Sequence, residues 1–170
     1  MDLIRGAMKF NEIRQAYAKN MASLQKQWKD SPYMIDPYFY DWASIFTPIE
    51  EAMWGEIRSI GLPMFPQVPV LNYFVDFGNP FVKVAIECDG AEWHDAEKDA
   101  ERDRKLNNEG WTIYRVPGSV CLKSLPCPAE LKELELDEEE FLTRVHAYET
   151  TTARSVVMRI KEKHFVKGEF

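Results

Sequence analysis

The chain has 170 residues, 45% of them hydrophobic, and a formal net charge of −7. This length predicts one domain with its own core and an added extension. It contains no run of about 20 apolar residues, no signal peptide and an odd number of cysteines, which together predict a cytoplasmic protein without a membrane partner or a disulfide framework.

The charge is unevenly distributed, which weakens the argument that an acidic protein avoids nucleic acid. Residues 1–29 carry six basic against two acidic side chains, and residues 154–170 carry five against two. Residues 130–149 hold eight acidic and two basic side chains. Such a run is typical of a solvated helix face.

Apolar residues recur at spacings of three and four near the N-terminus, which predicts an amphipathic helix about five turns long. Its apolar stripe consists of Phe10, Ile13, Tyr17, Met21, Leu24 and Trp28. We expect this helix to pack on the domain; a basic arm along a nucleic-acid backbone and a homodimer interface are the alternatives. An aromatic loop follows at 30–42, where Pro32 and Pro37 exclude a long regular element. Its rings either fill the edge of the core or stack on bases.

A helix start is predicted at Thr47-Pro48-Ile49-Glu50, with Thr47 as the N-cap and Glu50 as its capping-box partner. Gly61 is expected to end this helix. Capping is a sufficient structural role for Glu50.

Three strands are expected next, at 65–71, 73–77 and 82–88, with Gly78, Asn79 and Pro80 forming the turn between the last two. Asp76 then lies late in one strand of this hairpin and Glu87 late in the other, with Asp89 on the same face as Glu87. Converging carboxylates raise one another's pKa unless a cation lies among them, and oxygen ligands suit Mg²⁺ or Mn²⁺. Solvated acids at strand ends are the alternative.

A charged helix is predicted over 96–109, with Lys98, Arg102 and Lys105 on one side, followed by a strand over 111–116. Because a strand–helix–strand passage returns parallel to the strand it left, the sheet should be mixed. A helix is expected over 137–148, with Phe141, Leu142, Val145 and Tyr148 toward the core. Residues 150–170 fit either a basic helix or a strand.

The ordered set of residues resembles the PD-(D/E)XK nuclease superfamily, and within it the domains related to the very short patch repair endonuclease. The set consists of Glu50, Gln67, Val75-Asp76-Phe77, Ile86-Glu87-Cys88-Asp89-Gly90 with His94, Asp99, Arg102-Asp103, Leu106, Gly110-Trp111 and Tyr114-Arg115. The resemblance covers about residues 47–120. It divides the chain into an N-terminal helix and loop (1–46), a nuclease core (47–120) and a helical extension (121–170).

The resemblance implies an α/β restriction-endonuclease-like core, α-β-β-β-α-β, with a mixed sheet flanked by helices, and Mg²⁺-dependent phosphodiester cleavage. It implies that Asp76 and Glu87 are the metal ligands and that Glu50 can reach the metal, with its neighbour Glu51 as the alternative. Asp89 stands where most members have lysine. His94 is therefore the candidate to activate or position water, since its pKa lies near 7; the alternative is a hydrogen-bonded spacer.

The predicted function is a metal-dependent DNA endonuclease, and the alternative is an inactive nuclease-like fold that serves as a binding module. Gln67, Arg102 and Arg115 are candidate nucleic-acid contacts, although either arginine could instead pair with nearby acids. A structural zinc site is the weaker metal hypothesis. Its ligands would be Cys121 and Cys127 with His146 or His164.

Overall fold

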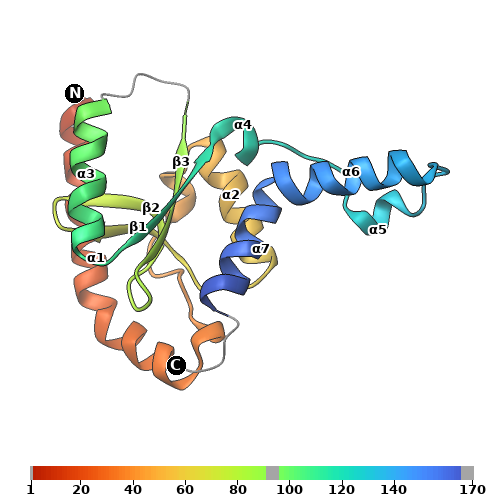
Figure 1. Cartoon of the computed structure of the whole chain (residues 1–170). Helices are drawn as coiled ribbons and strands as arrows, with labels where there is room; N and C mark the ends of the chain where they lie inside the picture. Colours follow the sequence, from red (N-terminus) through yellow and green to blue (C-terminus); the bar gives the residue numbers. More distant parts are fainter. Residues whose placement is uncertain (1, 91–95, 166–170) are drawn as a thin grey trace. The chain divides into compact units, whose positions relative to one another are not determined.

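The computed structural model describes residues 2–90 and 96–165, and its elements follow the predicted order (Figure 1). The N-terminal part contains α1 (Asp2–Asp30), two 3-10 turns, η1 (Pro32–Met34) and η2 (Trp42–Ser44), and α2 (Pro48–Ser59). The sheet region contains β1 (Phe65–Val70), β2 (Tyr73–Asn79), β3 (Val84–Asp89), α3 (Ala96–Asn108) and β4 (Thr112–Pro117). The C-terminal part contains α4 (Gly118–Cys121), α5 (Pro128–Leu131), α6 (Glu138–Thr151) and α7 (Ala153–His164).

The contacts divide the chain into two compact units. Unit 1 comprises the described residues of Met1–Phe46, Pro63–Glu87 and Glu92–Arg115, and unit 2 those of Thr47–Leu62, Cys88–Ala91 and Val116–Phe170. Each unit is described by itself below.

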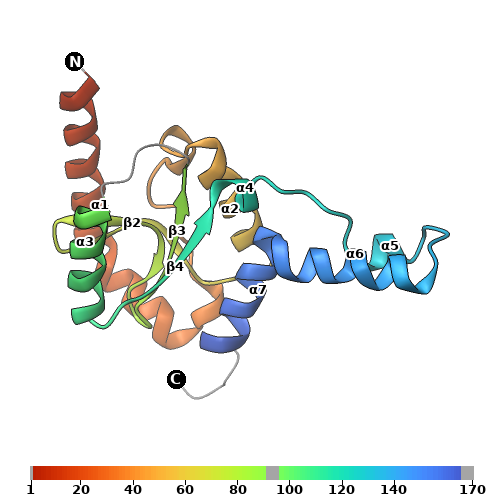
Figure 2. The same cartoon turned by 45° about the horizontal axis from the view of Figure 1, so that its top comes forward.

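The sheet has the strand order β1-β2-β3-β4, with β1 antiparallel to β2 and β2 antiparallel to β3. β3 and β4 run in the same direction, with α3 as the connection between them (Figures 1 and 2). The mixed sheet and the order α-β-β-β-α-β are therefore confirmed, and they define a restriction-endonuclease-like α/β core with an N-terminal helix added to it.

The hairpin between β2 and β3 turns later than predicted. Gly78 and Asn79 pair with Ala85 and Val84, so both belong to β2. A Cβ on Gly78 would lie 2.9 Å from Val75 Cγ2, so this glycine serves close packing rather than a turn. Asn79 is fully buried; its amide donates to the Pro63 carbonyl at 2.6 Å and its side-chain oxygen accepts from the Phe81 amide at 2.9 Å. The turn therefore begins after Asn79, whose side chain caps it.

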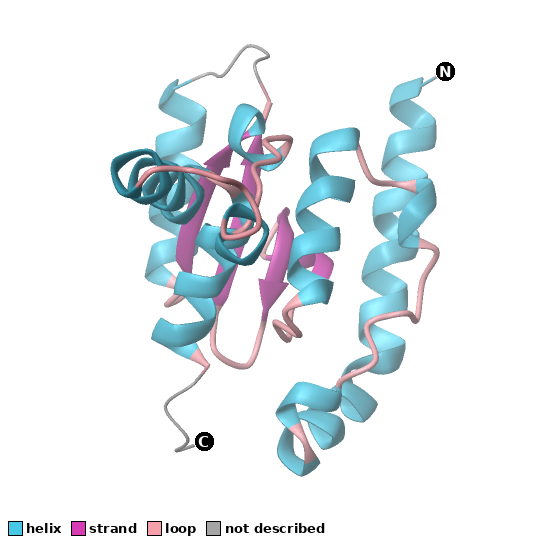
Figure 3. Ribbon diagram, turned by 90° about the vertical axis from the view of Figure 1, so that its right-hand side faces the viewer, coloured by secondary structure: helices cyan, strands magenta, loops and turns pink. Residues whose placement is uncertain are grey.

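Helix α1 runs without interruption from Asp2 to Asp30 (Figure 3). It packs through the predicted stripe. Ile13, Tyr17 and Leu24 are buried in the core of unit 1, whereas Phe10 remains 45% exposed. The Tyr17 hydroxyl donates to the carbonyl of Pro66 on β1 at 2.5 Å. The expectation that the helix packs on the domain is confirmed.

The aromatic loop supplies part of the same core. Trp42 is buried, and its indole donates to the Pro37 carbonyl at 2.6 Å. Phe39 packs edge-on against both Tyr17 and Trp42. These rings fill the core edge, in agreement with the first of the two interpretations of the loop.

In unit 2, α2 has the predicted capping box and ends at Ser59, followed by the cap residue Ile60. Gly61 then stops the helix with a φ of 63°, which favours glycine. The tail is helical rather than a strand: Thr152 caps α7, which buries Val157 and Ile160. The predicted buried side of α6 is only partly right: Phe141, Val145 and Tyr148 are half-buried, but α6 has no fully buried residue and Leu142 is 56% exposed. Its apolar positions are too few to form a wide stripe among the charged ones.

Candidate functional site

Glu87, near the end of β3, is the most buried of the predicted acids in unit 1. Only 6% of it is exposed. Burial raises the pKa of its carboxyl, while Arg102, Arg115 and the backbone amide of Asp76 each act to lower that pKa. A nearby cation therefore has a large effect on whether this buried carboxyl is charged.

Arg102 of α3 supplies such a cation. One guanidinium nitrogen forms an ion pair with Glu87 Oε1 and also donates to the Phe74 carbonyl of β2 at 2.8 Å. Arg102 thereby connects α3 to two strands of the sheet. Of the alternatives for Arg102, pairing with an acid is what the structure shows, but the acid is Glu87 and not Asp99 or Asp103 of its own helix.

Asp76 lies in β2, half-buried, between two other predicted site residues. The pairs Pro66–Phe77 and Val68–Val75 place Gln67 of β1 opposite Asp76. Extending the pair Phe77–Ile86 by one position places Glu87 opposite Asp76 from the other side. By interpolation and extension from these neighbouring pairs, Gln67, Asp76 and Glu87 form one row across three strands.

Regular strand geometry is interrupted at this row. Gln67 is buried and has a φ of 49°, a conformation that is uncommon for a residue with a side chain. Phe65 and Val68 belong to the same core cluster, although strict alternation would place them on opposite faces. Irregular backbone of this kind concentrates at functional sites.

Arg115 of β4 pairs with Asp103 of α3 at 2.8 Å, and its charge also acts on Glu87. Asp103 is half-exposed, so the ion pair is partly solvated. The guanidinium of Arg115 lies close enough to Glu87 to lower the pKa of its carboxyl. The prediction that Arg102 and Arg115 contact nucleic acid is not tested by these contacts.

Two further predicted site residues, Glu50 and Asp89, belong to unit 2. Glu50 is buried at the start of α2, and its Oε2 accepts from the backbone amide and the hydroxyl of Thr47, both at 2.6 Å. Asp89 belongs to unit 2, where its carbonyl lies 3.2 Å from a Cβ built on Gly118. His94 lies outside the described residues.

The donor set of the row fits a hard cation, since Asp76 and Glu87 offer carboxylate oxygens and Gln67 an amide oxygen. Within residues 2–90 and 96–165, no three His, Cys, Asp or Glu side chains lie together as metal ligands. The expected convergence of three carboxylates is therefore not seen, and Asp76 and Glu87 remain the predicted ligand pair. The same finding gives the zinc hypothesis no support. The Cys121 thiol instead interacts with Cys88, which lowers the pKa of Cys121.

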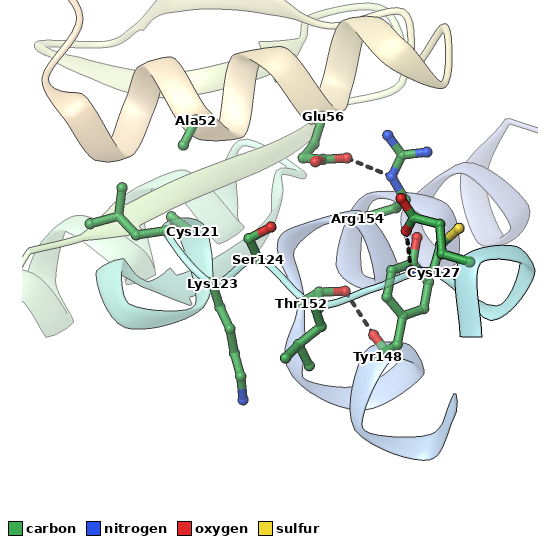
Figure 4. Close-up of a pocket in the computed structure, with 12 residues that line it drawn as sticks. Ala52, Glu56, Cys121, Lys123, Ser124, Cys127, Tyr148, Thr152 and Arg154 are labelled. Atoms are coloured by element: carbon green, nitrogen blue, oxygen red, sulfur yellow. Dashed lines mark hydrogen bonds and ion pairs between the residues drawn. The ribbon is translucent and has the colours of Figure 1, made fainter. Parts of the chain in front are cut away.

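A polar cavity of about 520 Å³ lies within unit 2 (Figure 4). Its wall includes Arg154, which pairs with Glu56 at 2.8 Å, and Glu130, which accepts from the Cys127 amide at 2.7 Å. None of the described nuclease-site residues lines it, whereas Cys121 and Cys127, the cysteines of the zinc hypothesis, do. Sequence reasoning did not anticipate this cavity, since its walls come from three separate segments without a shared motif.

The geometry and the comparisons define the class of protein. The sequence model of REase_MTES_1575, a restriction endonuclease-like family, matches residues 49–124. These residues include β1 to β4 and all eight predicted site residues. The chain belongs to this family, which is of the PD-(D/E)XK-like nuclease class.

Two uncharacterized proteins of Haemophilus influenzae (strain Rd) are similar to it. One is 32% identical over 90 residues, which cover 49% of this chain and 74% of the relative. The other is 30% identical over 95 residues, which cover 54% and 60% respectively. Among solved structures, the catalytic domain of the homing endonuclease I-Bth0305I is 17% identical, with 62% of this chain and 97% of that domain covered and a TM-score of 0.37. No described helix is long and apolar enough to span a bilayer.

Proposed function

We propose that this protein is a metal-dependent DNA endonuclease whose site is the row Gln67, Asp76 and Glu87. The observation that carries the proposal is the buried Glu87 carboxyl, held by Arg102 beside Asp76 at an interruption of the sheet. Packing alone does not require a carboxyl at this position, since an apolar residue of similar size would stabilise the fold equally well.

Asp76 and Glu87 would hold Mg²⁺ or Mn²⁺, which supplies charge relief on the phosphoryl oxygens and lowers the pKa of a bound water. Arg102 keeps the Glu87 carboxylate oriented, and Arg115 adds positive charge on the same side. Both guanidinium groups are suited to contact a phosphate. His94 is proposed to position or deprotonate the attacking water, in the place that lysine takes in most of the superfamily. A repair-type role in nicking DNA, as in very short patch repair, is the finer form of this proposal.

The test is incubation of supercoiled plasmid with Mg²⁺ or Mn²⁺, with Asp76→Asn and Glu87→Gln beside the wild type. We expect the wild type to nick or cleave the plasmid. Each of the two variants should lose at least about 100-fold in cleavage rate, because it removes a charge from the metal site. Glu139→Gln, an equal change of charge on the exposed start of α6, is the matched control and should cut normally. Equal cleavage by all four proteins would refute the assignment of the site.

A binding module without activity is the second candidate function. Two observations favour it: Arg102 already neutralises Glu87, and Asp89 occupies the place of the usual lysine. Binding of DNA by the wild type with no cleavage under any metal would select this function.

A further inference from the structure

Helix α3 carries a basic stripe of which the proposed metal site uses only Arg102. Lys98, Arg102 and Lys105 are spaced by four and three residues and therefore share one face of the helix. At 1.5 Å per residue the stripe extends about 10 Å, or roughly three base steps of a duplex. Lys98 and Lys105 are exposed, while Arg102 is half-buried.

Tyr73 of β2 lies against this stripe. Its ring centroid is 5.8 Å from the Arg102 guanidinium carbon and 5.9 Å from Lys105 Nζ. Lys105 Nζ also lies 3.5 Å from the Tyr73 hydroxyl. The ring therefore restrains both cations, which reduces the entropy they would lose on binding an anion.

The stripe is continuous with the proposed site, because Arg102 belongs to both. It contacts Glu87 on one side and the Tyr73 ring on the other. A DNA strand that reaches Glu87 would thus meet the positive charge of α3 directly beside it.

At the Lys105 end of the stripe, the acid that pairs with the lysine is weakly held. Glu101 contacts Lys105 at 2.7 Å, but the two side chains are 52% and 49% exposed. Ion pairs in water at this level of exposure contribute little, so Lys105 can exchange Glu101 for a phosphate at small cost.

We propose that the α3 stripe, defined as Lys98, Arg102 and Lys105 with Tyr73, binds the phosphate backbone of the DNA strand next to the scissile bond. This inference rests on the proposed function and adds the surface that orients the substrate. The contacts are to phosphate and carry no sequence preference.

Binding is measured by fluorescence anisotropy of a short labelled duplex in EDTA, where no cleavage occurs. We expect Lys105→Gln to weaken binding about fivefold at 100 mM salt and to reduce the slope of log K against log salt by about one. Glu101→Gln should strengthen binding, since it removes the competing acid. Lys132→Gln and Glu139→Gln are matched controls, because they make the same changes of net charge at exposed positions of unit 2.

The outcomes separate the inference from the proposed function. Equal effects of Lys105→Gln and Lys132→Gln would mean that only net charge matters and would overturn the inference, as would the absence of DNA binding by the wild type. A wild type that fails to cut plasmid but shows the expected order of affinities would support the stripe and refute the nuclease activity. Normal cleavage with unchanged affinity in Lys105→Gln would refute the stripe alone.

Discussion

Arg102 on α3 forms an ion pair with Glu87 at the end of β3, across 15 positions of sequence. The pair connects the crossover helix to the strand that carries the strongest candidate ligand. It also explains how a carboxyl with 6% exposure is tolerated in this sheet.

Arg102→Ala should destabilise the protein, because it leaves Glu87 buried without its cation. We expect about 2 kcal/mol, below the ~3–5 kcal/mol of fully buried pairs, since the Arg102 side chain retains 18% exposure. Urea denaturation measures the change. Lys105→Ala, which breaks the exposed pair with Glu101 on the same helix, is the control and should stay within about 0.5 kcal/mol. Equal losses in the two variants would contradict the role of the Glu87 pair.

The stability of the wild type should fall relative to Glu87→Gln as the pH rises. Burial raises the pKa of Glu87 in the folded state, so the folded protein binds the proton more tightly than the unfolded chain. The stabilising effect of the bound proton is complete below the unfolded pKa and is lost as the pH passes the folded pKa. Unfolding free energies of both proteins, measured between about pH 4 and pH 7.5, provide the comparison. A difference that is constant or that changes in the opposite direction would show that the pKa is not raised.

Thr47→Ala should cost about 1 kcal/mol, because the Thr47 hydroxyl accepts from the Glu50 amide in the capping box. Glu50→Gln retains a side-chain oxygen for the Thr47 amide and should cost less. Thermal unfolding compares the two. If Glu50 also serves the metal, the plasmid assay will show reduced cleavage by Glu50→Gln despite its retained stability. Unchanged cleavage would restrict Glu50 to capping.

Gly78→Ala should destabilise by about 2 kcal/mol, since the new methyl would lie 2.9 Å from Val75 Cγ2 and 3.1 Å from Trp111 Cζ3. Gly55→Ala is the matched control: it is exposed within α2, and a Cβ there meets nothing within 4 Å. Because alanine favours a helix, the control should gain about 0.5–1 kcal/mol. Similar melting temperatures for the two variants would contradict the close packing at Gly78.

His94→Ala should lower kcat by about 100-fold or more and leave metal affinity nearly unchanged, if His94 acts on the attacking water. The measurements are plasmid cleavage at saturating metal and a Mn²⁺ titration. His146→Ala, on α6, is the control histidine variant. An unaltered kcat would exclude His94 from the chemistry.

The local elements could be predicted from the sequence because their signals are short-range. The Thr47–Glu50 capping box, the Gly61 helix end and the apolar stripe of α1 each depend on residues within a few positions of one another. The turn after β2 was misplaced because glycine and asparagine favour turns on average. Here a glycine is required at position 78 because side chains of β1, of β2 and of the residue before β4 approach it closely. Asn79 caps the turn from within β2.

The sequence by itself determined the order of elements, the mixed sheet and the residues of the proposed metal site, since periodicity, caps and motif spacing are properties of the chain alone. Only the tertiary structure decided that Gln67, Asp76 and Glu87 form one row and that Arg102 pairs with Glu87. It also decided that α6 has no fully buried residue. The reason is physical: strand register and ion-pair choice depend on which distant segments meet, and burial of a carboxyl depends on everything packed around it.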